Sequence, residues 1–276
     1  MTPQDFVFHS RQSGNGTGDM LSLPRELAGW EWMSFFVHRL APGQSHTVHT
    51  ENEEAAIILL GGKCVADWGE GRQRIGERAH VFDGLPYTIY LPATSRAELR
   101  AETECEFAEC RVPSSARLKP QLIGPGDVKS SLRGGGNASR QIIDVMPPDF
   151  PADKLMVVEV YTPSGNWSSY PPHKHDTDDP PRETALEETY YHRIRSGEGF
   201  ALQRVYTRDG TLDETVAARD GDVVLVPRHG YNIYYLNCLA GSARLLSTTE
   251  DPDHLWVHST WNQVDPRLPL VQPRGF

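Results

Sequence analysis

A pair of histidines separated by one residue carries the clearest signal for chemistry in this sequence. The segment from Tyr170 to Asp176 reads Tyr-Pro-Pro-His-Lys-His-Asp, with imidazoles at His173 and His175. Residues two apart on an extended strand project to the same face, so these two rings would share one focus while Lys174 points to the opposite side. Neutral imidazole is a ligand for zinc, iron, copper and nickel, and for manganese when carboxylates join it. The spacing therefore indicates part of a metal site.

Further groups of the right type follow along the chain. Glu188, Tyr190 and His192 alternate along the next predicted strand, so they would share one of its faces. We expect that strand to pair antiparallel with the histidine strand across the loop 177–185. His229 comes later, directly after an apolar run that ends in Pro-Arg. A glutamate and a third histidine would complete the donor set of a transition-metal site.

The N-terminal half holds a second histidine pair, His46 and His49, with a different spacing. Three residues apart on a strand places the two rings on opposite faces. The segment 83–92, which matches in pattern the run before His229, contains no histidine. We therefore expect the N-terminal half to be free of metal and architectural, with a second metal site there as the less favoured alternative.

The overall composition excludes several classes of function. The chain has 276 residues, of which 27 are Lys or Arg and 37 are Asp or Glu, and its formal net charge is −10. Nucleic-acid readers and proteins that bind anionic membranes normally carry the opposite excess. No apolar run approaches the roughly 18 residues of a membrane span, and the N-terminus lacks the features of a secretory signal. We expect a cytoplasmic protein, whose four cysteines form no Cys-x-x-Cys pair and are reduced thiols.

The elements that must position these residues are predicted to be strands. Short apolar runs separated by 24 glycines and 21 prolines favour many strands and few helices. The expected strands span residues 31–39, 55–60, 64–68, 87–91, 97–101, 104–112, 156–161, 167–170, 188–195, 200–206, 222–226, 231–237 and 244–247. A stretch rich in Pro, Gly and Ser over 113–138 is the expected linker.

The two halves of this pattern are alike, so we expect an all-β fold with two antiparallel β-sandwich or barrel domains of the jelly-roll type in tandem. The domains would span residues 1–125 and 126–276. The tail from residue 251 would wrap as extended chain against a surface of the second domain.

The order of the chemical residues resembles a known family. His-x-His, then Glu, then Gly-Asp-x4-Pro closing on His is similar to the two metal-binding motifs of the cupin barrel, although twelve residues separate His175 from Glu188 where cupins usually have three or four. Longer strings, between about His9 and Trp261, resemble the 5-deoxy-glucuronate isomerases of bacterial myo-inositol catabolism. These strings are Phe82–Tyr87, Arg133–Asn137, Pro171–Asp176, Glu187–Arg193 and Tyr234–Asn237.

This resemblance implies a bicupin with its metal in the C-terminal barrel. It also implies a relationship to the 5-keto-4-deoxyuronate isomerases, whose site consists of three histidines and one glutamate. Carried over by residue, the metal ligands would be His173, His175, Glu188 and His229. The expected metal is one divalent ion, zinc or manganese.

The activity that the resemblance implies is an aldose–ketose isomerisation of 5-deoxy-D-glucuronate to 5-dehydro-2-deoxy-D-gluconate. Four protein ligands would leave one or two positions on the metal for the C1 carbonyl and the C2 hydroxyl oxygens. A route through an enediol needs a base, and Tyr190, on the face of Glu188, is the first candidate, with His192 the second. Arg204 and Arg193 are candidates to bind the substrate carboxylate.

Two other functions stay open at this point. One is a bicupin that binds a sugar acid without turnover, and the other is a metal-dependent cupin dioxygenase. The sequence does not choose between proton transfer and hydride shift for the isomerase. The expected partner is a small sugar acid, with neither nucleic acid nor membrane. The oligomeric state is undetermined, a homo-oligomer included.

Overall fold

The computed structural model describes residues 6–10, 17–196, 198–226 and 236–272. The chain forms two compact units, and neither is a continuous segment. The N-terminal unit contains Ser10–Val128, Asp149–Met156 and the residues after Leu270, whereas the C-terminal unit contains Lys129–Pro148, Val157–Leu270 and the residues up to His9. A single division at residue 125, as expected from the sequence, would assign the first nine residues and the segment 149–156 to the other unit.

The N-terminal unit consists of two antiparallel sheets. The first has six strands in the order β11-β8-β5-β10-β3-β2, and the second has four in the order β4-β9-β6-β7. The strands of the first sheet are β2 (Gly18–Leu23), β3 (Ser34–Leu40), β5 (Glu53–Gly61), β8 (Tyr87–Leu91), β10 (Cys105–Pro113) and β11 (Gln121–Ile123). Those of the second are β4 (Ser45–Thr50), β6 (Cys64–Asp67), β7 (Arg72–Ile75) and β9 (Ser95–Ala101), and the short helices of the unit are α1 (Arg25–Ala28) and η2 (Val81–Asp83).

Alternation along these strands builds the core of the N-terminal unit. Along β9, Ala97, Leu99 and Ala101 are buried and polar residues fill the positions between them. That period of two places one face of the strand on the core. The three side chains belong to the same apolar cluster as Ile57 and Leu59 of β5, a strand of the other sheet. The core therefore joins the two sheets.

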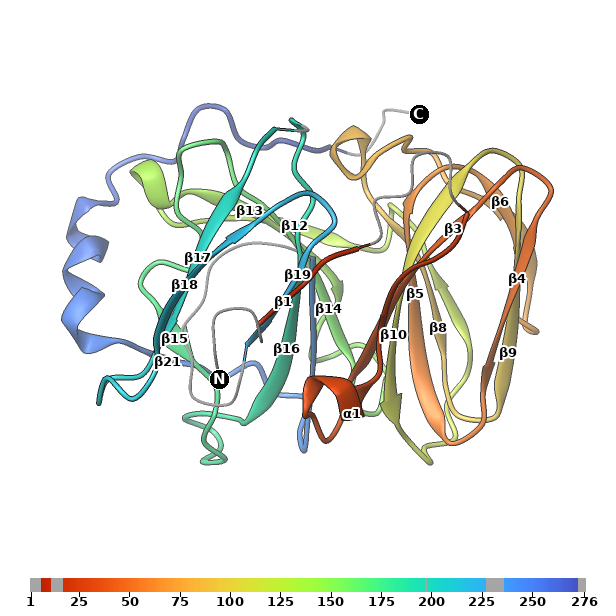
Figure 1. Cartoon of the computed structure of the whole chain (residues 1–276), viewed down its shortest axis with the longest axis horizontal. Helices are drawn as coiled ribbons and strands as arrows, with labels where there is room; N and C mark the ends of the chain where they lie inside the picture. Colours follow the sequence, from red (N-terminus) through yellow and green to blue (C-terminus); the bar gives the residue numbers. More distant parts are fainter. Residues whose placement is uncertain (1–5, 11–16, 197, 227–235, 273–276) are drawn as a thin grey trace. The chain divides into compact units, whose positions relative to one another are not determined.

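The C-terminal unit has a seven-stranded antiparallel sheet in the order β1-β19-β16-β20-β14-β13-β12. Its strands are β1 (Val7–Phe8), β12 (Lys129–Arg133), β13 (Arg140–Met146), β14 (Met156–Tyr161), β16 (Leu186–Tyr191), β19 (Val223–Val226) and β20 (Leu236–Gly241). The pairs β15 (His173–Lys174) with β21 (Thr249–Glu250) and β17 (Ala201–Tyr206) with β18 (Asp213–Ala218) form two small sheets, and the 3₁₀ helices are η3 (Gly136–Ala138) and η4 (Pro252–Thr260). The first strand of the chain, β1, lies beside β19 (Figure 1).

Strand β16 is central to the second unit. It pairs with β19 on one side and β20 on the other, and all six of its residues are buried. Two of these six residues, Glu187 and Glu188, are acidic. A buried carboxylate must find partners inside the protein because it has lost its hydration. Glu188, buried on this strand, therefore requires hydrogen-bond donors or a cation close to its carboxylate.

The all-β expectation is confirmed, and several details are wrong. Residues 167–170 are not a strand, since Ser169 has a φ of 51° in the left-handed region. Residues 244–247 are not one either, and the Arg244 guanidinium instead donates to the carbonyl oxygens of Pro147 and Pro148. The expected linker contains β11 and β12. Residues 231–235 of the strand expected at 231–237 lie outside the described residues.

The tail after residue 250 was expected to be extended, and that expectation is wrong for its first part. Residues 252–260 form the 3₁₀ helix η4. The side chain of Asp251 accepts a hydrogen bond from the backbone N–H of Asp253, and Pro252 occupies the first turn. Both features favour a helix start. This helix brings two histidines, His254 and His258, to the C-terminal unit.

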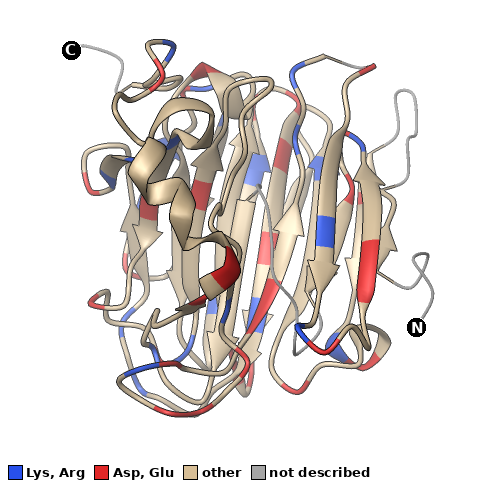
Figure 2. Ribbon diagram, turned by 90° about the vertical axis from the view of Figure 1, so that its left-hand side faces the viewer, with Lys and Arg blue, Asp and Glu red and all other residues tan. Residues whose placement is uncertain are grey.

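Two findings concern membranes and polyanions. Among the described residues, none of the helices has both the length and the apolar composition that a membrane crossing requires. In the view of Figure 2, acidic and basic positions are interspersed along the strands, and no continuous basic stripe is visible in the described part of the chain.

Candidate functional site

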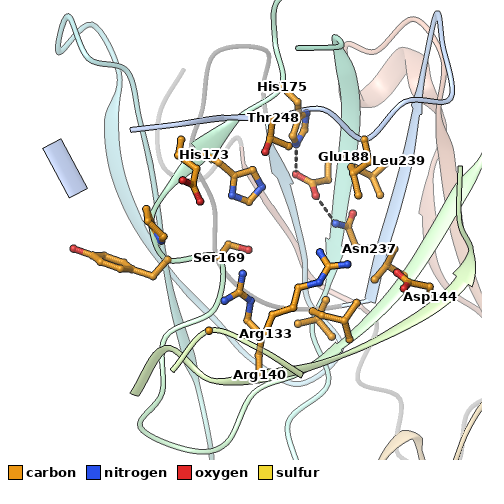
Figure 3. A pocket seen from close by; sticks show the side chains of 18 of the residues that line it. Arg133, Arg140, Asp144, Ser169, His173, His175, Glu188, Asn237, Leu239 and Thr248 are labelled. Carbon is orange, nitrogen blue, oxygen red and sulfur yellow. Dashed lines mark hydrogen bonds and ion pairs between the residues drawn. The ribbon is translucent and has the colours of Figure 1, made fainter. Parts of the chain in front are cut away.

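A cavity of about 340 Å³ lies in the C-terminal unit. Its walls come from β12, β13, β14, β16 and β20, together with the segments 169–175 and 246–261. His173, His175 and Glu188 all line it (Figure 3). The structure thus places three of the four expected metal ligands on one cavity. The fourth, His229, lies outside the described residues.

His175 and Glu188 contact each other directly in this cavity. The Nε2 atom of His175 lies 2.8 Å from Oε2 of Glu188, and its Nδ1 atom lies 3.2 Å from the carbonyl oxygen of Leu186. A carbonyl only accepts, so Nδ1 carries a proton and Nε2 is the nitrogen that faces the carboxylate. Asn237 of β20 donates to the other oxygen of Glu188. These contacts orient one imidazole and one carboxylate toward the cavity, as the outer partners of a metal site do.

The pKa values of His173 and His175 are shifted in opposite directions. Burial lowers the pKa of His173 to about 4, and the nearby charge of His175 acts in the same direction. Burial would also lower the pKa of His175, but the adjacent Glu188 carboxylate outweighs it and raises that pKa above its ordinary value. His173 is therefore neutral at pH 7, with a ring nitrogen lone pair free to bind a metal.

The backbone that carries the two histidines differs from the expectation. The sequence predicts that their strand pairs with the strand of Glu188, and this is wrong. In the described residues β15 pairs with β21, so that His173 lies opposite Glu250, and β16 pairs with β19 and β20. The two segments meet at one backbone hydrogen bond, from the N–H of Leu186 to the carbonyl oxygen of His175.

The long loop between His175 and Glu188 is held by Glu183. One oxygen of this carboxylate accepts from the backbone N–H groups of Asp176, at 2.8 Å, and Thr177, at 2.9 Å. The same oxygen lies 2.8 Å from Nζ of Lys174, and the hydroxyl of Thr249 donates to the other oxygen. Lys174 does not line the cavity. The loop between His175 and Glu188 is thus held in place by the Glu183 hydrogen bonds, which also fix the segment that carries the two histidines.

The expected catalytic residues lie elsewhere in the C-terminal unit. Tyr190 is buried in an apolar cluster with four aliphatic side chains, those of Val216, Ala218, Val224 and Val226. The Nε2 atom of His192 lies 3.1 Å from the amide oxygen of Gln203, and burial lowers the His192 pKa to about 4. Neither side chain is part of the cavity wall in the described residues. The alternation along β16 continues past Glu188, but it leads into a packed interior.

The two expected substrate ligands are also outside this cavity. Arg204 is half exposed and makes a two-pronged contact with Asp213 across the β17–β18 hairpin, at 2.7 and 2.9 Å. Arg193 donates from Nε to Asp220 at 3.0 Å. A carboxylate engages each guanidinium, and neither arginine is part of the cavity wall in the described part of the chain.

Sequence reasoning missed the two arginines that do line the cavity. Arg133 ends β12 and Arg140 begins β13, and their guanidinium groups point into the same space as His173 and Glu188 (Figure 3). Both lie in or beside the stretch interpreted as a linker. The string Arg133–Asn137, which is part of the family resemblance, was a signal for Arg133, and Arg140 lies three residues beyond it.

Two further histidines, one on the cavity wall and one in contact with a wall residue, were missed as well. The Nε2 atom of His258, on η4, lies 3.2 Å from Oε2 of Glu250, and both residues line the cavity. The hydroxyl of Tyr170, another lining residue, lies 2.8 Å from Nδ1 of His254. Nothing in the local pattern around these histidines distinguishes them, because helix η4 was not expected.

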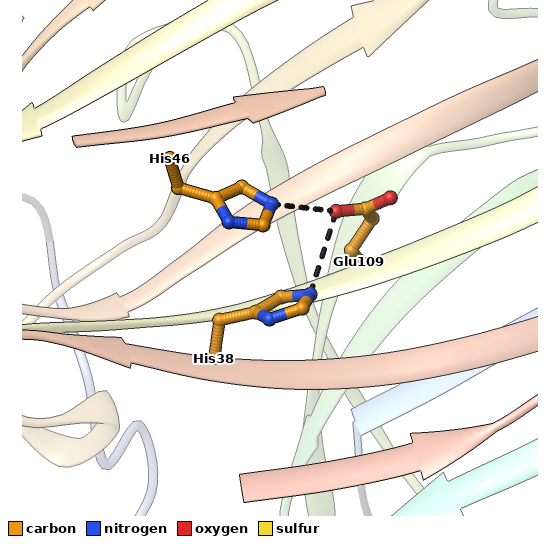
Figure 4. Close-up of side chains that lie close together, drawn as sticks. All are labelled: His38, His46 and Glu109. Carbon is orange, nitrogen blue, oxygen red and sulfur yellow. Dashed lines mark ion pairs between the residues drawn. The ribbon is translucent and has the colours of Figure 1, made fainter. Parts of the chain in front are cut away.

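The N-terminal unit has its own cluster of potential ligands. Among the described residues, one group of three such side chains has ligand atoms that all lie within 4.8 Å of one another: His38, His46 and Glu109 (Figure 4). From the sequence, His46 was expected to act, if at all, together with His49, and His38 was not among the candidates. The structure places His49 on the exposed side of β4 instead. Burial would raise the Glu109 pKa, but His38, His46 and Arg111 together lower it, so this carboxyl is ionised.

Two antiparallel β units, one of which has imidazole and carboxylate groups around an internal cavity, define a bicupin. Within that class the chain belongs to the KduI/IolB family, whose model matches residues 7–257. The chain is 45% identical to a 5-deoxy-glucuronate isomerase of Geobacillus kaustophilus, over 89% of this chain and 92% of that protein.

Solved structures agree with this assignment. The crystal structure of an IolB-like protein from Salmonella typhimurium LT2 has a TM-score of 0.87 and 36% identity, covering 91% of this chain and 98% of that one. An oxalate decarboxylase of Bacillus subtilis, a protein with Mn(II) centres, has a TM-score of 0.57 at 17% identity, covering 89% of this chain and 79% of that one. The second likeness concerns the fold alone.

Proposed function

We propose that this chain is a metal-dependent 5-deoxy-glucuronate isomerase, which converts 5-deoxy-D-glucuronate to 5-dehydro-2-deoxy-D-gluconate. The observation that carries the proposal is the division of the cavity wall. Imidazole and carboxylate groups that suit a divalent cation stand at one side, and two arginines that suit a substrate carboxylate stand near them. The curated relatives in this family have the same name.

The residues at the first side fit a divalent metal. His173 is neutral, His175 presents Nε2 toward Glu188, and the Leu186 carbonyl holds the proton of His175 on its other nitrogen. We propose these three side chains as ligands, with His229 as the fourth, and zinc or manganese as the metal. When bound, the metal would polarise the aldehyde carbonyl and acidify the neighbouring hydroxyl.

The two arginines would bind the other end of the substrate. A guanidinium offers parallel N–H donors that match the two oxygens of a carboxylate. Arg140 and Arg133 line the cavity together with Asn237 and Ser169, which add polar contacts for hydroxyl groups. Fixing the carboxylate would also fix the distance of C1 and C2 from the metal ligands, and positioning of this kind accelerates the reaction.

The Glu250–His258 pair is the proposed proton carrier. The isomerisation removes a proton from C2 and returns one to C1, while the proton of the C2 hydroxyl passes to the C1 oxygen. An imidazole 3.2 Å from a carboxylate can accept a proton and release it again. His258 is partly exposed and belongs to the cavity wall, so it can reach both the substrate and solvent.

We also propose that the protein is cytoplasmic. All four cysteines are free thiols and all are buried, which agrees with a reducing compartment.

The direct test is to follow 5-deoxy-D-glucuronate by NMR with the purified protein, without redox cofactor and without oxygen. Conversion that stops on chelation and returns with zinc or manganese is the expected result. Binding of the sugar acid without conversion would leave only the non-catalytic alternative, and an oxygen requirement would point to a dioxygenase. Substrate deuterated at C2 should lose label to solvent if His258 carries a proton.

Substitution of Arg140 separates the carboxylate contact from the rest of the site. Arg140→Gln removes a charge-assisted hydrogen bond of about 1.5–3 kcal/mol, so kcat/KM should fall about tenfold to a hundredfold. Arg204→Gln is the matched control because its guanidinium is paired with Asp213 on the outer hairpin. Equal losses in the two variants would refute the assignment.

A further inference from the structure

The N-terminal unit contains a cluster that the isomerase reaction does not use. We propose that His38, His46 and Glu109 bind a second divalent cation, of the zinc class, which joins the two sheets of this unit. The expectation of a metal-free N-terminal half is thereby replaced by a testable site.

The three side chains converge from both sheets. His38 lies on β3 and Glu109 on the neighbouring β10, where residue 107 is opposite His38, so these two are diagonal neighbours on one face. His46 lies on β4 of the four-stranded sheet, on the face that also carries the buried Val48. A cation bound to all three would therefore connect the sheets directly.

The distances suit a tetrahedral centre. Nε2 of His46 lies 3.5 Å, and Nε2 of His38 3.6 Å, from the same carboxylate oxygen, Oε2 of Glu109 (Figure 4). Two ligand atoms about 2.1 Å from a zinc ion at a tetrahedral angle are about 3.4 Å apart. Small rotations of the side chains would therefore close the set. Three protein ligands leave a fourth position for water.

The carboxylate is prepared for a cation. One oxygen of Glu109 is engaged by the Arg111 guanidinium. The other, Oε2, is buried and has no hydrogen-bond donor among the described residues. The contacts at 3.5 and 3.6 Å are too long for hydrogen bonds. A buried anionic oxygen without a donor is costly, and a bound cation would satisfy it.

The imidazoles are also held by outer partners. Nδ1 of His38 lies 2.8 Å from Oδ1 of Asp19, so the proton resides on that nitrogen and Nε2 presents its lone pair. This carboxylate–histidine arrangement is the usual outer support of a metal-binding histidine. Phe107 packs against both rings, with centroids 5.1 Å from His38 and 5.2 Å from His46. Two imidazoles and one carboxylate are a donor set for zinc or manganese rather than for magnesium or calcium.

The test uses the full chain, first stripped with a chelator and then titrated with Zn²⁺. His46→Ala should bind one zinc equivalent fewer than the unsubstituted chain. His49→Ala is the matched control, since it removes a histidine of the same strand from the opposite, exposed face, and it should bind the same amount as the unsubstituted chain. His175→Ala removes a ligand of the proposed catalytic metal, so the zinc that this variant still binds reports on the N-terminal cluster. The double variant with His175→Ala and His46→Ala should bind one zinc equivalent fewer than His175→Ala alone.

Two further measurements keep the test decisive. Co²⁺ should give visible absorption bands of a tetrahedral centre in His175→Ala, and these should vanish in His175→Ala combined with Glu109→Gln. Zn²⁺ should raise the melting temperature of His175→Ala and of its His49→Ala derivative, but not of its His46→Ala derivative. Equal zinc content with and without His46, or no uptake at all by His175→Ala, would show that the cluster is an ion pair only and would overturn the proposal.

Discussion

Glu54 of the N-terminal unit is a fully buried acidic residue whose side chain accepts four hydrogen bonds, and its replacement tests how the fold of this unit is stabilised. Glu54 is 0% exposed. One oxygen accepts from the backbone N–H groups of Lys154 at 2.6 Å and Leu155 at 2.7 Å. The other accepts from the N–H of Asp153 at 2.8 Å and from the hydroxyl of Tyr90 at 2.7 Å. Four donors face the group, so it is a carboxylate.

The substitution Glu54→Gln keeps the shape of the side chain and removes acceptors. If the NH₂ group takes the place of Oε2, the Tyr90 hydroxyl can turn and accept from it, so that only the N–H of Asp153 loses its acceptor. In the opposite placement the N–H groups of Lys154 and Leu155 both lose theirs. Hydrogen bonds to a charged group contribute about 1.5–3 kcal/mol each and neutral ones about 1 kcal/mol. Losing one bond and the charge assistance of the other three therefore gives a gross loss of about 3–6 kcal/mol. The variant no longer buries a charge, which offsets part of that loss. We expect unfolding to become easier by about 3–4 kcal/mol.

Urea unfolding of the full chain, followed by tryptophan fluorescence, measures this change. Tyr90→Phe removes a single donor and should cost about 1.5–2 kcal/mol. Glu53→Gln is the control on the same strand. Its carboxylate is partly exposed, and its ion pairs within the described part of the chain are long, 3.6 Å to Arg25 and 3.5 Å to Arg111. Such pairs contribute at most about 1 kcal/mol.

The order of the three variants decides the question. If Glu54→Gln is no more costly than Glu53→Gln, the segment 153–155 is not anchored through this carboxylate. If Tyr90→Phe equals Glu54→Gln, the backbone donors contribute nothing.

Two further predictions concern the C-terminal unit. His192, with its pKa lowered to about 4 by burial, is protonated first in the unfolded chain, whose histidines titrate near 6.5. The contribution of neutral His192 to the free energy of unfolding is therefore complete above pH 6.5, and it falls by about 2 kcal/mol at pH 5. In urea unfolding at both pH values, His192→Gln should lack this part of the loss of stability at low pH. The same loss in His192→Gln and in the unsubstituted chain would contradict the prediction. Glu183→Gln should loosen the loop that follows His175 and lower zinc affinity at the proposed catalytic site by about tenfold, measured by competition with a chelator; an unchanged affinity would show that the loop does not position the ligands.

Local periodicity explains what the sequence could predict. The alternation of His173 with His175 needs only the geometry of one strand, and the apolar run Val223–Val226 before His229 needs only a buried sheet. Both are properties of a few consecutive residues. The all-β class follows from the same kind of information, repeated along the chain.

Non-local pairing explains what it could not predict. Arg140 reaches the cavity because β13 pairs with β14, and Arg133 because β12 pairs with β13, yet the surrounding glycines and serines are typical of a linker. Arg204 was a reasonable candidate by type, but Asp213 lies near its cross-strand partner and engages it first. The His38 cluster joins three strands from two sheets, so no spacing in the sequence could indicate it.

The exchange of segments between the two units has a consequence for synthesis of the protein. Domains commonly fold in order as they leave the ribosome. Here the donors for the buried Glu54 are residues 153–155, which are translated only after β12 and β13 of the other unit. Conversely, β1 is made first but must wait for β19 to pair. Neither unit can complete its fold until part of the other unit has been translated. A nascent chain that stalls near residue 128 would therefore leave the Glu54 carboxylate without its backbone donors and β1 without its partner strand.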